Sequence, residues 1–527
     1  MQGNGEPYAS DSGTAYSNGE LNDLLELIRS SEAASGGGSI ELLLRQMNPQ
    51  TASVVRLCAI PHRFNPRLIR VLAPDISPRR AEDEYRRILS LSMITTSGES
   101  AQMHDLMRGH LFHQWLEPAN EQEFRRASAA LYDYFRTLSG NSQGPDKTEP
   151  YRYRAMFHLI GANQTAGFKE FDALYRERHH QFRLAECERL VRLVGEYKPA
   201  LTPDHAIQLL YCEAQVAADY RRWEEARGHL TRVLASPDAG NDLKARAENR
   251  LGIIDAAERN YDSAIAHYDT ALNLAQMGGS EYPYAYRIKH DLGAAYRDKG
   301  DSDKAQDLLK ESIQLALAAE DYAYVATSYN SLGLLHGRRH EMAEAVEALT
   351  LSIAALQKIG DTVREATVYN NLGNIHYDVG RWTETEHFYD RSLEITKQTS
   401  DSYGQAVALT NLGSVYQRAK KYPQAMEALE EATRIFEWIG DSYKSGLVRR
   451  KLARLYWRLG RQAEARDSFE KAIAHFEKRG GKTEAAETRT ELDRLGKKVG
   501  LPWWAWVGIA IALVFVLLII GVFAEDL

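Results

Sequence analysis

The apolar positions in the second half of the chain recur with a period of about 40 residues. A leucine followed by a small residue stands at 251–252, 292–293, 332–333, 372–373, 412–413 and 452–453, so the spacing is 41 once and 40 four times. Twelve residues after the second member comes another small residue, and four residues later a large apolar one. Apolar residues at helical spacing indicate paired helices, and the small residues let the two helices approach closely. The pattern predicts a series of helical hairpins.

These features resemble the tetratricopeptide repeat, in the 40-residue version seen in kinesin light chains. The resemblance covers residues 204–495 and gives seven units, of which the first, around Ala226, is the weakest match. Asp361, Asp401 and Asp441, again 40 residues apart, are placed to cap the first helix of the next unit. The resemblance implies a superhelix with a concave groove, lined by the first helix of each hairpin, that binds protein partners.

Polar residues at the groove positions of this family form the predicted partner-binding site. In the family these positions lie two and three residues before the repeat glycine and one, four and five residues after it. The positions selected are Asn330, Asn370, Asn371, Asn374, Asn411, Arg418, Arg450, Lys451, Arg454 and Arg458. Asparagine amides can hold an extended backbone, and arginines capture carboxylates. A peptide or helix of a partner protein, with an acidic end, is the expected ligand, and solvated polar helix faces are the open alternative.

A continuous apolar run lies near the end of the chain. Trp503–Ala524 holds 22 residues without a charge, which as a helix would span about 33 Å, the thickness of a bilayer core. Trp503, Trp504 and Trp506 suit the headgroup level, and a lysine pair just before them favours a cytoplasmic N-terminal side. We therefore expect one transmembrane helix at 502–524 in a single-pass, tail-anchored membrane protein whose bulk is cytoplasmic.

The chain before the repeats falls into three segments. Residues 1–39 are rich in glycine, serine and acidic residues, with one apolar patch at Leu21–Ile28, and are predicted to be a disordered arm. Residues 40–118 hold short helical pieces that begin at prolines, and then two short runs of strand-forming residues around a Ser-Gly-Glu-Ser turn, which predicts a β-hairpin. Residues 119–203 keep helical spacing and are predicted to be a helical linker.

The segment 40–118 resembles the winged-helix domain of STAND NTPases, which are signalling ATPases. The resemblance rests on Ala59–Asn65 and on Met103–Arg108, which matches the Met-His-Asp motif of that family. In the family, the motif histidine reads the phosphates of a nucleotide held by a preceding ATPase domain, and His104 is its counterpart. Fewer than forty residues precede Ile40, too few for such a domain, so His104 is expected to be a packing residue at a helix start. The resemblance implies a split signalling protein that works with a separately encoded NTPase.

Composition and motifs favour no enzymatic activity. Charged residues make up 26% of the chain and the formal net charge is -7, which is ordinary for a globular protein. The three cysteines show no Cys-x-x-Cys spacing and the sixteen histidines no metal-binding motif, so no metal and no cofactor is predicted. We expect a mainly α protein, with a winged-helix domain followed by a tetratricopeptide α-solenoid and one C-terminal transmembrane helix, that acts as a scaffold or adaptor.

The open alternative is a membrane-tethered regulator that binds nucleic acid through the winged helix. The helix expected after Pro78 carries Arg79, Arg80, Arg86 and Arg87. Three consecutive acidic residues, at 82–84, interrupt these arginines, so the helix offers no clean basic face to phosphates. Nucleic-acid binding is therefore not expected.

Overall fold

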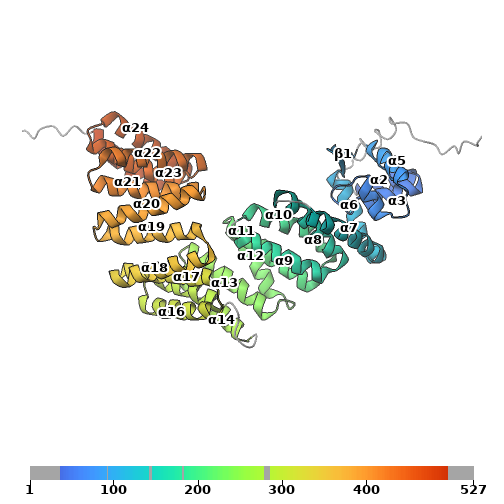
Figure 1. The fold of residues 1–527 in the computed structure, drawn as a ribbon, viewed down its shortest axis with the longest axis horizontal. Coiled ribbons are helices and arrows are strands. Elements are labelled where there is room, and N and C mark those ends of the chain that lie inside the picture. Colours follow the sequence, from blue (N-terminus) through green and yellow to red (C-terminus); the bar gives the residue numbers. More distant parts are fainter. Residues whose placement is uncertain (1–35, 92, 142–144, 181–182, 278–284, 497–527) are drawn as a thin grey trace, which may run out of the picture. The chain divides into compact units, whose positions relative to one another are not determined.

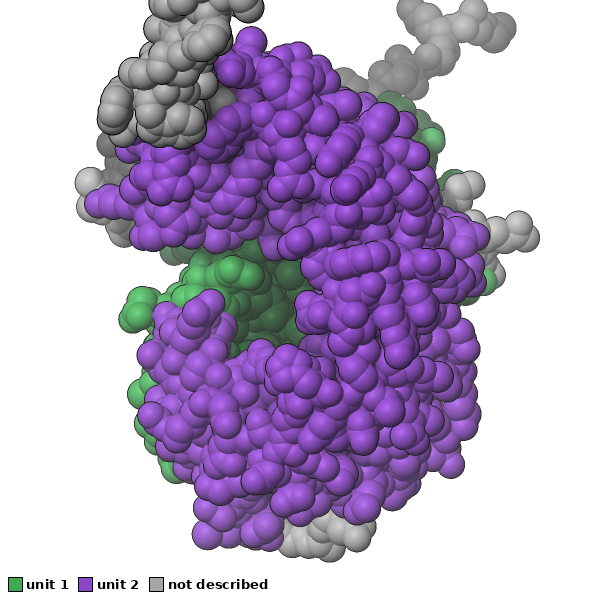
Figure 2. All heavy atoms as spheres, turned by 90° about the vertical axis from the view of Figure 1, so that its left-hand side faces the viewer, with its two compact units in different colours: residues 1–254 green, residues 255–527 purple. Residues whose placement is uncertain are grey.

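The computed structural model describes residues 36–91, 93–141, 145–180, 183–277 and 285–496. They divide into two compact units, Met1–Ile254 and Asp255–Leu527, coloured green and purple in Figure 2. The division falls within helix α13, Asn241–Ala257. The described residues are mainly helical, as the sequence predicts (Figure 1).

Unit 1 begins with short helices and a β-hairpin. Its first elements are α2 Gly36–Gln46, α3 Pro49–Cys58, α4 Pro66–Leu72, α5 Pro78–Leu89, β1 Ile94–Ser97, β2 Ser100–Met103, α6 Asp105–Trp115 and a 3-10 turn, Pro118–Asn120. Three of these helices start at a proline whose preceding residue caps the helix, because Asn48, Asn65 and Ser77 accept hydrogen bonds from backbone amides of the first turn. The caps predicted at Asn65 and Ser77 are thereby confirmed.

The hairpin pairs β1 and β2 antiparallel, with Ile94 opposite Met103 and Ser97 opposite Ser100. Gly98 adopts a φ of 61° in the turn, a conformation that glycine accepts without steric cost. Ile94, Ala101 and Met103 are buried in a core shared with α2, α3 and α6. The predicted hairpin is therefore present, and it covers one side of the short helices.

Longer helices complete unit 1: α7 Glu121–Asn141, α8 Pro145–Ala162, α9 Gln164–His180, α10 Leu184–Gly195, a 3-10 turn Lys198–Ala200, α11 Pro203–Asp219 and α12 Trp223–Ala235, followed by α13. Their core holds Phe124, Leu131, Phe157, Phe171 and Tyr197, all at most 5% exposed. Residues 119–203 thus have a hydrophobic core of their own and are more than a linker.

Unit 2 is a stack of antiparallel helix pairs, drawn in chain order in Figure 1. Its helices are α14 Tyr261–Met277, α15 Ala285–Lys299, α16 Ser302–Ala318, α17 Tyr322–Arg338, α18 Met342–Ile359, α19 Thr362–Asp378, α20 Trp382–Gln398, α21 Ser402–Arg418, α22 Tyr422–Ile439, α23 Ser442–Arg458, α24 Gln462–Lys478 and α25 Lys482–Gly496. The hairpins predicted from the 40-residue period are present.

The periodic small and large residues explain why each pair packs closely. The small residues twelve positions after the glycine are fully buried, among them Ala305, Ala345 and Ala425. The large residues four positions later, such as Leu349 and Leu429, are at most 2% exposed. A Cβ atom on Gly333 would lie 2.7 Å from Leu349 Cγ, closer than real atoms approach. The glycine is therefore required by the helix contact, as ridges-into-grooves packing expects.

Aspartates start the first helix of several pairs. Asp361, Asp401 and Asp441 each precede the helix, and their carboxylates accept hydrogen bonds from the backbone amides of Arg364, Gly404 and Lys444. Asp301 and Asp321 cap α16 and α17 in the same way. The capping predicted from the 40-residue spacing is confirmed, since these carboxylates satisfy amides that the helix leaves unpaired.

The predicted fold class needs one correction. Among residues 36–496, with the gaps given above, no helix is long and apolar enough to cross a membrane. The longest of these helices, α7, carries Glu121, Glu123 and Arg125 in its first turns, which a bilayer core would not accept. The segment 502–524 lies outside the described residues. The fold described is mainly α with a repeat solenoid, and the predicted transmembrane helix and single-pass membrane location are corrected accordingly.

Two further sequence predictions meet the boundary of the described residues or the surface. Of the predicted disordered arm 1–39, residues 1–35 lie outside the described residues, whereas residues 36–39 belong to α2. His104 precedes α6 as its cap residue, but its side chain makes no capping hydrogen bond and the residue is exposed. His104 is therefore at a helix start, as expected, but it is not a packing residue.

Candidate partner-binding face of the repeats

The first helices of the pairs in unit 2, α15, α17, α19, α21 and α23, form one surface, which we call the inner face. All ten predicted site residues lie on four of these helices, α17, α19, α21 and α23. Figure 2 shows the purple surface of unit 2 with a deep hollow at mid-height. The second helices, α16, α18, α20, α22 and α24, form the opposite, outer layer of the stack.

A row of hydrogen bonds crosses the inner face from helix to helix. Asn371 Nδ2 donates to Asn330 Oδ1 at 2.8 Å, and Asn411 Nδ2 donates to Asn370 Oδ1 at 2.8 Å. The partners are 41 residues apart in both pairs. Each pair uses one N–H and one carbonyl oxygen, and an asparagine amide offers two donors and two acceptor sites. The four asparagines thus stitch α17, α19 and α21 together while keeping hydrogen-bonding capacity.

The same row continues at both ends with other residue types. His290 Nε2 lies 3.0 Å from Ser331 Oγ, which joins α15 to α17. Lys451 Nζ donates to Ser414 Oγ at 2.9 Å, which joins α23 to α21. The hydrogen-bonded row therefore spans five consecutive first helices. Its position fixes how these helices are spaced and which side chains remain at the surface.

Asn374 has a different role from the other asparagines. Its Oδ1 accepts a hydrogen bond of 2.6 Å from the Tyr389 hydroxyl. Tyr389 is 2% exposed, and burial raises the pKa of its hydroxyl well above the ordinary value, so the group stays protonated and donates. Asn374 thus satisfies a buried tyrosine of α20, because a buried hydroxyl without a partner would be costly. It supports the helix pair from within.

Two of the predicted cations are already paired within the chain. Arg450 contacts Glu487 at 3.0 Å, and Arg454 donates to both carboxylate oxygens of Glu491, with its Nε at 2.7 Å. Both glutamates belong to α25, which follows the last hairpin. The hydrogen bond to Glu491 raises the pKa of the Arg454 guanidinium. Helix α25 thus neutralises part of the basic cluster that the sequence suggested for an acidic ligand.

Three predicted cations have no carboxylate partner among the described residues. Arg418 is exposed, and its Nε donates only to the Tyr377 hydroxyl, at 3.3 Å. Arg458 is exposed and forms no ion pair within the described ranges. Lys451 is partly buried, and desolvation lowers the pKa of its amine, with further lowering by the charges of Arg454 and Lys444. This end of the inner face, at α21 and α23, is where an anion would gain most.

The other end of the inner face is balanced in charge. Asp298 accepts from Arg297 Nε at 3.0 Å and contacts Arg338 at 3.0 Å. Arg338 also donates to the backbone oxygen of Arg297. Desolvation would raise the pKa of the Asp298 carboxyl, but the hydrogen bond and charge of Arg297 and the charge of Arg338 hold it below the ordinary value. The two arginines are therefore satisfied internally.

The arginines of α5 are partly paired as well. Arg86 lies 3.7 Å from Glu82, Arg87 lies 3.2 Å from Glu84, and Arg80 donates to Gln50. Glu84 is 2% exposed and also accepts a hydrogen bond of 2.8 Å from Thr51. The acidic residues that interrupt the basic run thus contact it directly. This geometry offers few free guanidinium groups to nucleic-acid phosphates.

The described residues offer little that resembles a catalytic or metal centre. Within them, no group of three or more His, Cys, Asp or Glu side chains is placed to hold a metal ion. The three cysteines, Cys58, Cys187 and Cys212, are buried and unpaired. Burial raises the pKa of each thiol above the ordinary value, which disfavours the reactive thiolate. The inner face remains the candidate site.

Comparison with family models identifies the repeats. One tetratricopeptide repeat model matches residues 243–318, 284–358 and 364–437, and a second matches residues 410–480. These residues carry tetratricopeptide repeats. The matched range contains every predicted site residue. The family models leave residues 1–242 unmatched, so the winged-helix assignment of residues 40–118 stays a prediction, and a search of curated proteins found no match.

Solved structures with similar folds include several tetratricopeptide proteins. A signal transduction ATPase with numerous domains (STAND) protein with a tetratricopeptide repeat sensor, from Pyrococcus horikoshii, has a TM-score of 0.50 at 16% identity, over 93% of this chain and 68% of that one. A Rap protein complexed with competence and sporulation factor has a TM-score of 0.43 at 14% identity, over 62% and 98% of the two chains. The quorum sensor NprR from B. thuringiensis gives 0.42 at 13%, over 64% and 100%. At these identities the likeness concerns the fold.

Proposed function

We propose that this chain is a non-catalytic interaction protein whose inner face binds an extended segment of a partner protein. The observation that carries the proposal is the row of hydrogen bonds on the inner face, which ends at Lys451, an amine without a carboxylate partner among the described residues. The asparagine pairs retain N–H and carbonyl groups at regular intervals, which suit the regular donors and acceptors of an extended backbone.

The charge at α21 and α23 indicates the chemistry of the partner. Removing an ammonium from water is costly unless an anion compensates for it, and Lys451 makes only a neutral hydrogen bond, to Ser414. A partner carboxylate placed between Lys451 and Arg418 would offset this cost and form charge-assisted hydrogen bonds. We therefore propose that the bound segment carries an acidic residue or a terminal carboxylate at this end.

Affinity capture from native lysate with full-length chain tests the proposal. Lys451→Met keeps the length of the side chain and removes its charge, so it should lose a partner that the unchanged protein retains. Lys310→Met, on the outer layer at α16, is the matched control and should retain the partner, because Lys310 is exposed and distant in the fold from the inner face. Equal capture by both variants would exclude Lys451 from the binding site.

A gain-of-binding variant makes the test sharper. Glu487→Gln with Glu491→Gln would free Arg450 and Arg454 from their ion pairs. Binding of an acidic partner should then strengthen, most clearly at low ionic strength, where charge attraction is least screened. Unchanged or weaker binding would argue that the partner offers no acidic group to this end of the inner face.

The finer proposal is a split STAND-like signalling component that works with a separately encoded NTPase. It is motivated by the STAND protein with a tetratricopeptide repeat sensor, whose fold matches 93% of this chain. A partner captured through the inner face should then bind ATP, and its release or retention should change when ATP is added to the lysate. A captured partner without nucleotide binding would leave the adaptor role and exclude this version of it.

A further inference from the structure

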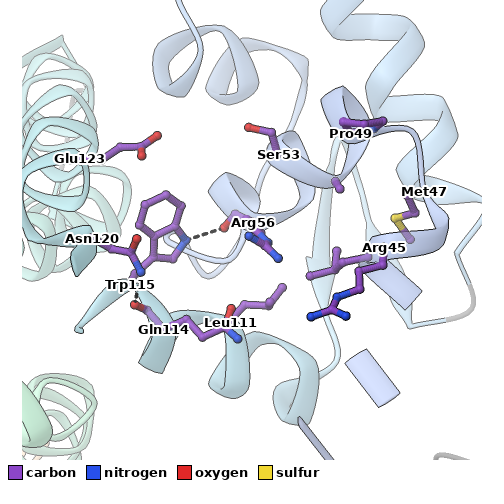
Figure 3. A pocket seen from close by; sticks show the side chains of 12 residues that line it. Arg45, Met47, Pro49, Ser53, Arg56, Leu111, Gln114, Trp115, Asn120 and Glu123 are labelled. Atoms are coloured by element: carbon purple, nitrogen blue, oxygen red, sulfur yellow. Dashed lines mark hydrogen bonds between the residues drawn. The ribbon is translucent and has the colours of Figure 1, made fainter. Parts of the chain in front are cut away.

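Unit 1 contains a cavity of about 410 Å³ between α2, α3, α6 and the start of α7. Apolar side chains of Leu44, Met47, Leu111 and Trp115 line it, together with Ala52 and Pro49. Polar groups from Arg45, Ser53, Arg56, Gln114, Asn120 and Glu123 complete the lining. Figure 3 shows Trp115, Asn120 and Glu123 on one side of the opening and Arg45, Met47 and Pro49 on the other. The volume lies within the range of about 300–1,000 Å³ typical of ligand pockets.

The walls of this cavity are held by hydrogen bonds within the chain. Trp115 Nε1 donates to the backbone oxygen of Arg56 at 2.8 Å, and Asn120 Nδ2 donates to the backbone oxygen of Gln114 at 2.7 Å (Figure 3). The indole is therefore fixed with its ring as part of the cavity wall, and the packing of α3 against α6 sets the width of the opening. The cavity is a built feature of the fold.

Two guanidinium groups lie at the rim. Arg56 contacts Glu41 at 2.6 Å, but its Nε is buried without a hydrogen-bond partner. Arg45, in the last turn of α2, is exposed and forms no ion pair within the described ranges. Glu123 stands at the opposite rim, on α7. An occupant with apolar groups inside and carboxylates facing Arg45 and Arg56 would match both the lining and the charge.

The chain itself contains such a segment, outside the described residues. Residues 20–28 read Glu-Leu-Asn-Asp-Leu-Leu-Glu-Leu-Ile, with apolar residues at 21, 24, 25 and 28. This i, i+3, i+4, i+7 spacing places four apolar side chains on one face of a helix. Glu20, Asp23 and Glu26 supply three carboxylates within the same nine residues. The segment thus combines an apolar face with acidic charge.

The chain length between this segment and the cavity permits docking within one molecule. Residues 29–35 separate the segment from Gly36, where α2 begins, and seven extended residues reach about 25 Å. Leu44 and Arg45 lie near the end of α2, about 12 Å along the helix from Gly36 at 1.5 Å per residue. The tether is therefore long enough to return along α2 to the cavity.

We propose that residues 20–28 dock as an amphipathic helix in this cavity, with Leu21, Leu24, Leu25 and Ile28 facing its apolar lining. The acidic residues then lie toward Arg45 and Arg56. Docking covers the exposed apolar lining of the cavity and links the first residues of the chain to unit 1. The interaction is separate from the inner face of unit 2, so its test does not depend on the proposed function.

Disulfide trapping in the full-length chain tests the register directly. The pair Leu25→Cys with Ser53→Cys places one thiol on the docked face and one at the exposed cavity rim. The control pair Glu26→Cys with Ser53→Cys has nearly the same tether length but points its first thiol away from the cavity. The native cysteines are buried and should not compete. We expect the Leu25→Cys pair to form an intramolecular disulfide at least about tenfold faster than the control.

Three outcomes would overturn the proposal. Equal rates for the two pairs would mean that residues 20–28 approach the rim without a preferred face. Disulfides that form only between two chains, and increase with protein concentration, would assign the cavity to a second copy. Unchanged amide hydrogen exchange in α2 and α3 on the double substitution Leu24→Asp with Leu25→Asp, compared with Asn22→Asp, would mean that the segment does not cover the cavity.

Discussion

The glycine of each repeat is where a single atom decides the packing of two helices. In Gly333→Ala the new Cβ would meet Leu349 at less than 3 Å, so α17 and α18 would have to separate. We expect a loss of about 1–3 kcal/mol in the free energy of unfolding, as for other overpacked cores. Thermal denaturation of the variant should show a lower Tm for unit 2.

The matched control is a helical glycine with open space around it. Gly228 lies in α12, and a Cβ added there would meet nothing within 4 Å. Gly228→Ala should stabilise the helix by about 0.5–1 kcal/mol, because alanine loses less backbone entropy on folding than glycine. If the two alanine variants had the same Tm, the close helix contact would not be the reason for the recurring glycine.

A buried histidine should make unit 2 sensitive to mild acid. His376 is 6% exposed, neither ring nitrogen has a hydrogen-bond partner, and its ring lies 5.1 Å from that of Phe388. Desolvation, and then the charge of Arg381, lower the pKa of His376 below 6.5. The unfolded chain therefore binds the proton first, so stability present above about pH 6.5 should be lost as the pH falls.

His376→Phe should remove this part of the pH dependence. We expect the Tm of the variant to fall less than that of the unchanged protein between pH 7.5 and pH 5, measured under otherwise identical buffers. His62 and His158 in unit 1 also have lowered pKa values, again chiefly through desolvation, so the comparison rests on the difference between the two proteins. Parallel pH profiles would contradict the assignment to His376.

At the scale of elements, the aspartate caps are the most repeated device. Asp441→Ala removes the acceptor for the Lys444 amide and should cost about 0.5–2 kcal/mol, whereas Asp441→Asn keeps an acceptor oxygen and should cost less. Amide exchange in the first turn of α23 measures the effect locally. Similar exchange in the alanine and asparagine variants would mean that the cap contributes little there.

The elements also show where sequence reasoning succeeds and where it stops. The helix pairs and their caps follow from the 40-residue period, because the small residue, the large residue and the aspartate recur at fixed positions and each has a local physical cause. The pairing of Asn370 with Asn411 depends on how neighbouring first helices are set against each other, one repeat plus one residue apart. The period alone does not give this offset, so these asparagines were predicted only as ligand contacts.

The basic cluster was misjudged for a related reason. Arg450 and Arg454 were assigned to an acidic ligand because they occupy groove positions of the last repeat. Their partners Glu487 and Glu491 lie 37 residues further on, in α25, which continues the series of first helices after the last pair. Only the stacking of α25 on α23 and α24 brings these charges together. Lys451, in the same run of residues, has no such partner within the described ranges.

At the scale of the whole molecule, composition and repeats predicted a mainly helical chain, and this prediction is confirmed for the described residues. The prediction of a membrane-spanning helix was wrong for the described fold, since none of its helices is sufficiently apolar. That prediction came from the hydrophobicity of one segment taken by itself. The predictions that hold came instead from several positions recurring together.

The central claim is that a partner lies along the inner face of unit 2. The most direct measurement is photo-crosslinking in native lysate, with a photoreactive amino acid at the exposed position Asp378 on α19, or at the exposed position Glu427 on α22 of the outer layer. The account predicts a specific protein adduct from position 378 that is absent from position 427 and is lost in the Lys451→Met background. The same adduct from both positions, or from position 427 alone, would contradict it.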